Sequence, residues 1–303
     1  MPQRNLSFVY CYYKSHSALN SRKNMEIKDI LLKNEFHFKK QLGQNFITEV
    51  SLLRAVVRDS EVTSDDVVVE IGTGAGTLTA TISDSAKEVF TFDVDTSLKP
   101  ILEETLAGRE NITCIFKDIL KMSDAEFVEI VGDREFKVVA NIPYYITTPL
   151  IMRFIESDLK VKSITVMVQE EVADRLVARP NTEDYGAITL AVALRGVAKK
   201  TRTVDKRMFH PIPKVDSAVV HIAIDDSRYT YKDKKTLVNL MHAGFRMRRK
   251  TLVNNIQASF PAISKEVAKS ILVDCGFSET IRGEVLGVSE YILIADKIYD
   301  LLS

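Results

Sequence analysis

A four-residue loop of amide, proline and aromatic side chains has the composition needed to hold an amino group. It consists of Asn141, Ile142, Pro143 and Tyr144 and follows a run of apolar residues. Pro143 lacks a backbone N–H and fixes its own φ, and it biases Ile142 toward an extended conformation. The Asn141 side-chain oxygen and a carbonyl of the loop can then accept both hydrogens of one exocyclic amino group, while Tyr144 stacks on the base.

The chemistry that this loop would support is methyl transfer to the amino group. Two fixed acceptors draw the nitrogen lone pair out of the ring and toward a methyl sulfonium, so catalysis rests on positioning and electrostatics. No strong general base is needed, because the attacking nitrogen becomes cationic and acidic. Taken alone, the tetrapeptide is equally well explained as an Asn-x-Pro turn followed by buried tyrosines. Its place after a predicted strand, downstream of a cofactor pattern, favours function.

A glycine-rich turn further upstream has the features of a cofactor-binding loop. The apolar run 67–71 leads into Gly72, Gly74 and Gly76. This spacing is GxGxG, whereas dinucleotide-binding loops have GxGxxG. Glycines at such a turn let the backbone approach a ligand where a Cβ would block it. The carboxyl end of the first strand is also where open α/β sheets bind ligands.

Two aspartates end the next two predicted strands. Asp93 lies about 20 residues past the first glycine, where a carboxylate can accept both ribose hydroxyls of a nucleoside. We prefer it to Asp95 because it lies nearer the strand end. Asp118 ends the third strand and can accept from an adenine amino group of the cofactor. Each acid alone could be a helix N-cap, but together with the glycines these features resemble the class I S-adenosylmethionine methyltransferase pattern.

A proline-rich segment, 209–217, is a second candidate for the target site. Pro211 and Pro213 make it a rigid, extended loop. Phe209 could cover the other face of a base that has been taken out of its stack. Without the other motifs, a phenylalanine in the core would be the better interpretation. We assign His210 no catalytic role.

The elements that must position these residues follow an alternating pattern. From 66 to 224, short β-rich runs alternate with helical patterns, which is typical of βαβ units and a parallel sheet. We expect an α/β fold, with a Rossmann-like, class I methyltransferase sheet of seven mostly parallel strands and helices on both faces. The last two strands are expected to be antiparallel, and a helix over 49–59 precedes the sheet. The expected strands are 67–71, 88–93, 113–117, 137–141, 163–169, 200–204 and 217–224.

Strand patterns stop after residue 225, and helical spacing takes over. Ser264 and Ser289 are expected N-caps and Gly276 an expected C-cap. We therefore expect an N-terminal extension over 1–38 that is partly disordered, a catalytic domain over 39–225 and a small, all-helical RNA-binding domain over 226–303. The expected helices of that domain are 233–245, 249–259, 264–275 and 289–302.

The distribution of charge points to a nucleic-acid partner. The chain has 41 Lys and Arg against 41 Asp and Glu, yet basic residues clearly outnumber acids between Arg195 and Asn255. Such a basic region is a candidate nucleic-acid footprint. A compact cluster within it should contact phosphates, which adds affinity but little sequence information. An ordinary solvated helix face is the alternative. The cluster consists of Arg246, Arg248, Arg249 and Lys250, extended by Lys199, Lys200, Arg202, Lys206 and Arg207.

Composition argues against several other classes of protein. The three cysteines, at 11, 114 and 275, lack CxxC spacing, so we expect no disulfide framework and no metal site. No apolar run approaches the roughly 20 residues of a membrane-spanning helix. We expect a cytoplasmic monomer that needs no membrane. The basic, acid-free segment 1–24 leaves an organellar transit peptide, a start at Met25 and a disordered arm open.

These segments together resemble the KsgA-type ribosomal RNA small-subunit adenine N6,N6-dimethyltransferases. The resemblance runs from Lys39 to about Leu252. It implies S-adenosylmethionine as the cofactor. It also implies that two adjacent adenosines in a hairpin of small-subunit, 16S-type rRNA each receive two N6 methyl groups, on a pre-30S-type particle during ribosome biogenesis. The motifs that carry it are 39–47, 70–76, 141–144, 169–176 and 209–217.

The resemblance also implies roles for individual residues, Asn45 and Ile47 among them, which had none on other grounds. One departure is visible, because the family more often has Glu at the ribose position and this chain has Asp93. The shorter carboxylate keeps the chemistry but must sit closer to the ribose. The implied roles are closure over the cofactor by Asn45 and Ile47, the methionine end at Gly72, the ribose at Asp93, the adenine at Asp118 and the junction with the target at Asn141.

Three related functions stay open. Erythromycin-resistance methyltransferases share the catalytic motifs but act on 23S rRNA, and the helical tail with its basic cluster favours the small-subunit type. Mitochondrial transcription factor B proteins share the fold, and the N-terminal extension leaves this function open as an alternative. A mainly non-catalytic ribosome-assembly factor is the third alternative. The intact loop Asn141–Tyr144 argues for activity, because a pure RNA binder has no need of it.

Overall fold

The computed structural model describes residues 12–14, 30–31, 33–34, 36, 39, 45–47 and 49–303. The remaining parts of the N-terminal extension and residues 40–44 of the first motif lie outside the described residues. Contacts divide the chain into two units. The first is Met1–Glu170 with Thr201–His221, and the second is Glu171–Lys200 with Ile222–Ser303. The segment from Glu171 to Lys200 thus groups with the C-terminal helices, whereas we expected one boundary at 225.

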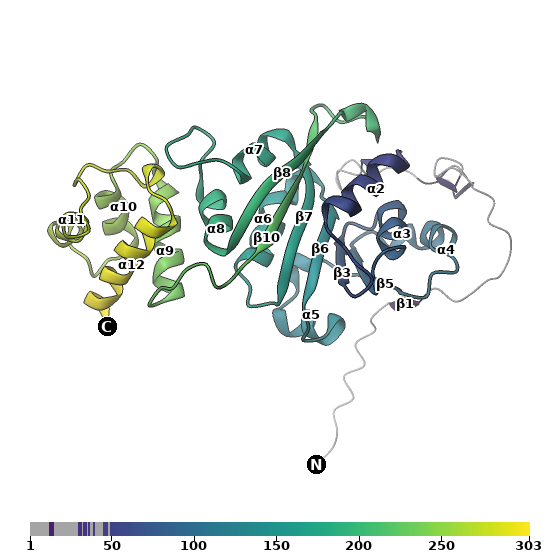
Figure 1. The fold of residues 1–303 in the computed structure, drawn as a ribbon, viewed down its shortest axis with the longest axis horizontal. Coiled ribbons are helices and arrows are strands. Elements are labelled where there is room, and N and C mark those ends of the chain that lie inside the picture. Colours follow the sequence, from purple (N-terminus) through teal and green to yellow (C-terminus); the bar gives the residue numbers. More distant parts are fainter. Residues whose placement is uncertain are drawn as a thin grey trace, which may run out of the picture. The chain divides into compact units, whose positions relative to one another are not determined.

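An α/β sheet forms the centre of the first unit (Figure 1). Its strand order is β1-β5-β4-β3-β6-β7-β10-β8, and the pairs from β5 to β7 are parallel. The boundary between the units runs through β8 and β10. The bounds are β1 Tyr12–Lys14, β3 Val67–Ile71, β4 Glu88–Asp93, β5 Ile112–Phe116, β6 Phe136–Asn141, β7 Val161–Gln169, β8 Gly196–Val204 and β10 Ser217–Ile224.

All seven expected strands are present, and two features of the strands were not expected. Strand β1 adds an antiparallel edge to β5, with Tyr12 opposite Ile115. A separate two-stranded sheet pairs β2, Phe46–Ile47, with β9, Phe209–His210, in antiparallel register. This small sheet brings the proline-rich segment beside the last two residues of the first motif.

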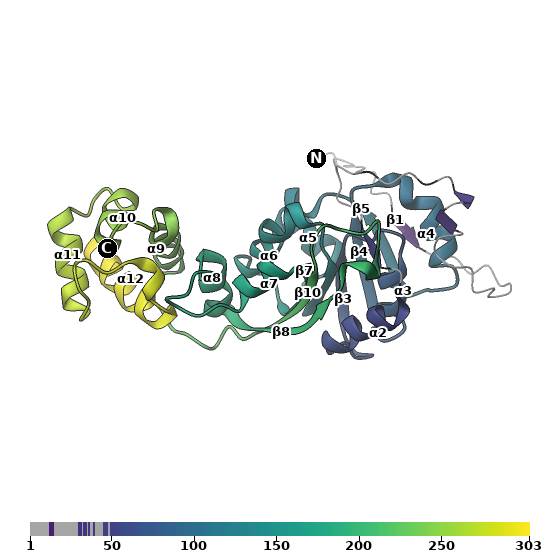
Figure 2. The same ribbon diagram turned by 90° about the horizontal axis from the view of Figure 1, so that it is seen from above.

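Helices cover both faces of the sheet, as Figure 2 shows for α2 and α3 on one face and α5 and α6 on the other. The first face is an aliphatic core, in which Val56 and Ile82 pack over Val68. The second face is aromatic, with Phe127 stacked on Phe92 at 6.1 Å between ring centroids. Burial on both faces explains why β3, apart from Glu70, and the centre of β6 consist of apolar residues. The helices are α2 Val50–Asp59, α3 Thr77–Ser83, α4 Lys99–Thr105, α5 Asp124–Val131 and α6 Thr147–Ile155.

The second unit is helical apart from its parts of β8 and β10. All four helices expected in the C-terminal region are present, and Leu240, Ile256 and Ile294 are fully buried between them. Helix α10 begins at Leu252 rather than Arg249, so the basic cluster precedes the helix instead of lying along its face. The helices are α7 Glu170–Leu176, α8 Ala187–Arg195, α9 Lys234–Arg246, α10 Leu252–Ser259, α11 Lys265–Asp274 and α12 Val288–Leu302.

Two of the three expected helix caps are confirmed. Ser264 caps α11, because its Oγ accepts from the backbone N–H of Val267 at 3.2 Å. Gly276 comes directly after Cys275, the C-cap residue of α11, and has a φ of +82°, which glycine adopts without strain. The expectation for Ser289 was wrong. Helix α12 starts at Val288, and Glu290 closes its first turn by accepting from the backbone N–H of Gly287 at 3.0 Å.

No helix among the described residues is long and apolar enough to cross a membrane. The same part of the chain contains no group of three or more His, Cys, Asp or Glu placed to hold a metal ion.

Candidate active site

One pocket of about 530 Å³ lies in the first unit where β3, β4, β5 and β6 end. Open α/β sheets bind ligands at this edge, and the volume is in the range of small-molecule sites. The pocket is not lined by Ile47, Gly76 or Phe209, which we considered for the cofactor or target site. The lining residues are Asn45, Phe46, Ile71, Gly72, Gly74, Phe92, Asp93, Val94, the segment 116–121 and the segment 141–146.

The glycine turn brings backbone to the wall of this pocket. Gly72 and Gly74 have φ values of +83° and +52°, which side chains with a Cβ rarely adopt. A Cβ at Gly72 would face the target loop, 3.6 Å from the Asn141 carbonyl oxygen and 3.8 Å from Pro143 Cδ. The turn after the first strand of the pattern and the loop after the fourth therefore meet at one place.

Asp93 ends β4 with its carboxylate in the pocket wall. Its Oδ2 accepts from the backbone N–H of Gly74 at 3.0 Å, and its Oδ1 from that of Asp95 at 2.9 Å. Burial raises the pKa of Asp93 despite these donors. Asp95, by contrast, pairs with Lys39 Nζ at 2.6 Å and accepts from the backbone N–H of Ser97. Of these two acids Asp93 lines the pocket, whereas Asp95 stabilises the local fold.

Asp118 both lines the pocket and caps a short helix. It lines the pocket, and its Oδ1 also accepts from the backbone N–H of Leu120 at 3.1 Å, which caps the 3-10 helix Ile119–Lys121. Its Oδ2 lies 3.3 Å from Lys121 Nζ. The N-cap interpretation is thus correct for one oxygen. A carboxylate has further lone pairs to offer, so this bond does not prevent contact with a ligand.

The target loop is fixed by a bond between distant parts of the chain. Asn141 Nδ2 donates to the backbone carbonyl oxygen of Asn45 at 3.1 Å, across 96 residues of sequence. Because the amide nitrogen is used in this way, Oδ1 is the atom left to accept from a substrate. Ile47, two residues after Asn45, is a core residue with 3% of its surface exposed.

Tyr144 and Tyr145 are not core residues, so that interpretation of the loop was wrong. Tyr145 is 59% exposed, and Tyr144 is partly buried along the pocket. The Tyr144 hydroxyl lies 2.9 Å from Ser217 Oγ. Burial raises the pKa of Tyr144, so its hydroxyl stays neutral at ordinary pH. The loop therefore presents an amide oxygen, a proline ring and a neutral aromatic ring to the pocket.

Phe209 does not face the pocket. It is 3% exposed and belongs to the core that also contains Ile47, Val204 and Val219. In β9 successive side chains point to opposite sides, so Phe209 turns inward and its neighbour His210 is exposed. The expectation that Phe209 covers the base is corrected by this burial.

Glu70 is a functional candidate to which we assigned no role. It is fully buried in β3, and its Oε2 accepts from Thr79 Oγ1 at 2.5 Å and from Thr91 Oγ1 at 2.8 Å. Thr91 in turn lies 2.6 Å from the hydroxyl of Thr73 in the glycine turn. Burial raises the pKa of Glu70 to about 8. The signal that could have revealed it is one acid inside an otherwise apolar strand, because buried carboxyls need partners.

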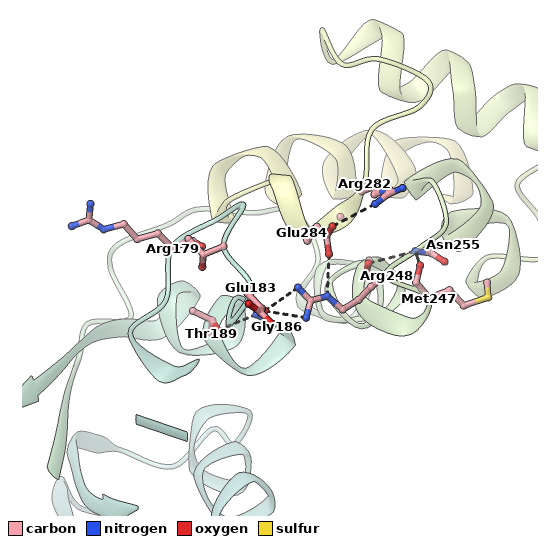
Figure 3. A network of polar contacts seen from close by, with 12 residues as sticks. Arg179, Glu183, Gly186, Thr189, Met247, Arg248, Asn255, Arg282 and Glu284 are labelled. Carbon is pink, nitrogen blue, oxygen red and sulfur yellow. Dashed lines mark hydrogen bonds and ion pairs between the residues drawn. The ribbon is translucent and has the colours of Figure 1, made fainter. Parts of the chain in front are cut away.

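The basic cluster lies in the second unit, with all four of its side chains exposed. Figure 3 shows Arg248 reaching between the loop that carries Glu183 and the side chain of Glu284. Its Nε donates to Glu284 Oε2 at 3.0 Å, and both Nη atoms donate to the Glu183 carbonyl oxygen at 3.2 Å. Arg248 therefore holds parts of this unit together. Among the described residues, Arg246, Arg249 and Lys250 make no comparable ion pair.

Three residues of the proposed extension of the patch are also paired. Lys200 contacts Asp174 at 2.9 Å within the second unit. Arg207 pairs with its near neighbour Asp205 at 2.6 Å. Arg202 forms a bidentate salt bridge with Asp59, in which its Nε donates to Oδ2 at 2.6 Å and its Nη2 to Oδ1 at 2.7 Å. The charge of these residues is thus largely balanced within the chain.

A parallel sheet, a glycine turn after its first central strand and an acid at the end of the next define the class I, Rossmann-like methyltransferase fold. Two solved structures share this fold. A dimethyladenosine transferase from Plasmodium falciparum matches with a TM-score of 0.73 at 24% identity, over 84% of this chain and 98% of that one. The 23S rRNA methyltransferase ErmE matches with a TM-score of 0.63 at 21% identity, over 84% and 99%.

The family follows from the sequence comparisons. The model of the ribosomal RNA adenine dimethylase family matches residues 35–291, and the chain belongs to this family. A protein from Clostridium botulinum, named ribosomal RNA small subunit methyltransferase A, is 40% identical over 92% of this chain and its own full length. A protein of the same name from Lactococcus lactis is 40% identical over 90% of this chain and 94% of its own.

Proposed function

We propose that this chain uses S-adenosylmethionine to dimethylate the N6 amino groups of two adjacent adenosines in a hairpin of small-subunit, 16S-type rRNA. The observation that carries the proposal is the meeting of the Gly72 turn with the target loop, 3.6 Å from a Cβ position on Gly72 to the Asn141 carbonyl oxygen. A methyl donor against the turn and an amino group on the loop would be neighbours. The full-length relatives at 40% identity support rRNA of the small subunit as the substrate.

The pocket residues fit S-adenosylmethionine. The backbone of Gly72 and Gly74 would lie against its methionine end, the Asp93 carboxylate would accept from the ribose hydroxyls, and Asp118 would accept from the adenine amino group. Both Asp93 oxygens accept backbone N–H bonds already, and each keeps a lone pair for a hydroxyl. When bound, the cofactor supplies an electrophilic methyl group.

The target loop would contribute by positioning the adenine amino group. Asn141 Oδ1, whose direction is set by the bond to Asn45, accepts one amino hydrogen, and a loop carbonyl accepts the other. Pro143 keeps the loop stiff, and Tyr144 stacks on the adenine. The nitrogen loses its proton after it has become cationic, so the loop needs no strong base. Phe209 has no part in this proposal, because its ring is buried.

We assign phosphate contact to Arg246, Arg249 and Lys250, whose side chains are exposed. Arg248 supports them by holding its loop. The protein would act as a monomer on a pre-30S-type particle in the cytoplasm during ribosome biogenesis. The two relatives described above come from bacteria, which gives no support to an organellar location.

Two alternatives are weaker on specific grounds. Likeness to ErmE extends only to the fold, at 21% identity, whereas the 40% identical relatives are named for the small subunit. A non-catalytic assembly factor would not need the Asn141 amide held in one orientation at a pocket.

The test is methylation with labelled S-adenosylmethionine of small-subunit particles that lack the modification, with large-subunit particles as the matched control. Mapping of the product should find two adjacent dimethylated adenosines in small-subunit rRNA. Label in the large-subunit RNA would favour the erythromycin-resistance type. Binding to the particles without any transfer would favour the assembly factor.

A further inference from the structure

Ser217 connects the proline-rich segment to the target loop. It begins β10 and is fully buried, and its Oγ lies 2.9 Å from the Tyr144 hydroxyl. The two residues are 73 positions apart in the sequence, and both belong to the first unit. Ser217 is the last residue of the motif 209–217, but nothing in the sequence assigns it a role of its own in the target site.

Tyr144 has little else to hold it. It starts the 3-10 helix Tyr144–Ile146, none of whose residues is buried and whose N-cap, Pro143, makes no side-chain cap. The turn is closed by a backbone bond of 3.1 Å from Ile146 to the Pro143 carbonyl. That bond fixes the backbone of the turn but makes no contact with the ring. The contact at the tip of the ring fixes the ring itself.

Ser217, in contrast, is a rigid anchor. Strand β10 lies between β7 and β8 in the sheet. The residue before it is held on both sides, since the Asp216 carbonyl accepts from the backbone N–H of Glu170 at 3.2 Å and its Oδ1 from that of Lys206 at 2.9 Å. Burying a hydroxyl is unfavourable unless it is hydrogen-bonded, so the bond to Tyr144 is also favourable for Ser217.

We propose that Ser217 is a positioning residue for methyl transfer, which holds the Tyr144 ring in the plane on which the target adenine stacks. Stacking depends on the relative orientation of the two rings. The inference rests on the proposed function of the target loop. It also gives the segment 209–217 a different task from base covering. At one end β9 pairs with β2 beside Asn45, and at the other end Ser217 holds Tyr144.

The experiment compares Ser217→Ala, Tyr144→Phe and the double variant in the full chain, with unmodified small-subunit particles as substrate. Loss of one hydrogen bond should lower kcat by about 3- to 10-fold in either single variant. The affinity for S-adenosylmethionine should not change. The double variant should be no slower than Tyr144→Phe, because both substitutions remove the same bond.

Two further variants separate positioning from simple loss of stability. Ser163→Ala is the matched control, since Ser163 is another buried serine of the same sheet whose hydroxyl has no hydrogen-bond partner among the described residues. It should leave kcat unchanged. Ser217→Thr keeps a hydroxyl and should restore most of the activity that Ser217→Ala loses.

Two outcomes overturn the role of Ser217 while the proposed function stands. One is an active wild type whose Ser217→Ala variant has an unchanged kcat. The other is a double variant whose loss is the product of the two single losses, which would mean that Ser217 acts independently of Tyr144. A wild type that binds the particles but transfers no methyl group would overturn the proposed function and this inference with it.

Discussion

Asn141 donates its side-chain N–H to the backbone carbonyl of Asn45 at 3.1 Å, and this bond decides which atom of the amide is free to accept. An asparagine amide has a donating and an accepting end of nearly equal size. Without the partner at Asn45, the side chain could present either end to a substrate amino group. The N-terminal motif therefore contacts the proposed target loop through Asn45, which also lines the pocket.

Asp93 and Asp95 should respond differently to replacement by alanine. Asp93→Ala removes a carboxylate from the pocket wall and should weaken S-adenosylmethionine binding by at least about tenfold. Asp95→Ala should instead lower the free energy of unfolding, since it breaks an ion pair to Lys39 and a cap on Ser97. Titration calorimetry and urea unfolding of both variants would measure this. Equal cofactor affinity in wild type and Asp93→Ala would refute the assignment of Asp93.

Phe209→Leu tests whether this ring belongs to the core or to the target site. Because the ring is buried, the change should cost about 1 to 2 kcal/mol of stability and leave kcat close to that of the wild type. The check is a denaturant series alongside steady-state kinetics below the unfolding temperature. A large fall in kcat at full stability would return Phe209 to the target site.

Glu70 should make stability depend on pH. Its pKa is raised from the usual 4.5 to about 8, so the folded chain keeps a proton that the unfolded chain has released above about pH 5. The contribution of Glu70 to the free energy of unfolding therefore falls as the pH rises from about 5 to about 8, by at most about 1.4 kcal/mol per pH unit. Glu70→Gln is uncharged and keeps an oxygen for Thr79 and Thr91.

Urea unfolding of wild type and Glu70→Gln at several values between pH 5 and pH 8 would measure this dependence. The free energy of unfolding of the variant should increase relative to that of the wild type as the pH rises. Glu103→Gln, at an exposed position of α4, controls for the loss of a carboxylate. Parallel curves for wild type and Glu70→Gln would show that Glu70 is already ionised in the folded chain.

The basic cluster should divide into two functions. Replacing Arg249 and Lys250 by alanine should weaken binding to small-subunit rRNA and reduce the slope of log affinity against log salt by about 1.5 to 2. Arg248→Ala should mainly lower the melting temperature, because its guanidinium joins Glu284 to the Glu183 carbonyl. The affinity of wild type and variants for small-subunit rRNA, measured at a series of salt concentrations, tests this. A salt slope untouched by the Arg249 and Lys250 changes would make the cluster an ordinary solvated surface.

Much of the fold could be predicted because its causes are local. Strands buried on both faces consist mainly of apolar residues. The tight turn after β3 needs positive φ values, and the glycines at 72, 74 and 76 reveal that turn in the sequence. The acids Asp93 and Asp118 stand at strand ends, so their common position followed from the parallel arrangement. The helices of the second unit have the regular spacing of apolar residues that a packed helix requires.

The remainder depends on contacts between distant residues. Strands β2 and β9 are two residues each, too short for any periodicity, so the sequence pattern could not decide between a buried Phe209 and one that faces the target. The bond from Asn141 to Asn45 joins positions 96 residues apart. Arg248 has the same side chain as Arg249, and only its tertiary partners distinguish the two.

The most direct test of the account is Asn141→Ala, assayed for methyl transfer and for rRNA binding in the same preparation. Gln257→Ala, which removes an exposed amide from α10, is the matched control. We expect Asn141→Ala to lose at least about 100-fold in kcat, as for a hydrogen-bond acceptor that acts on the transition state, while rRNA affinity stays within about threefold. Methyl transfer by Asn141→Ala at the wild-type rate would contradict the role of this loop.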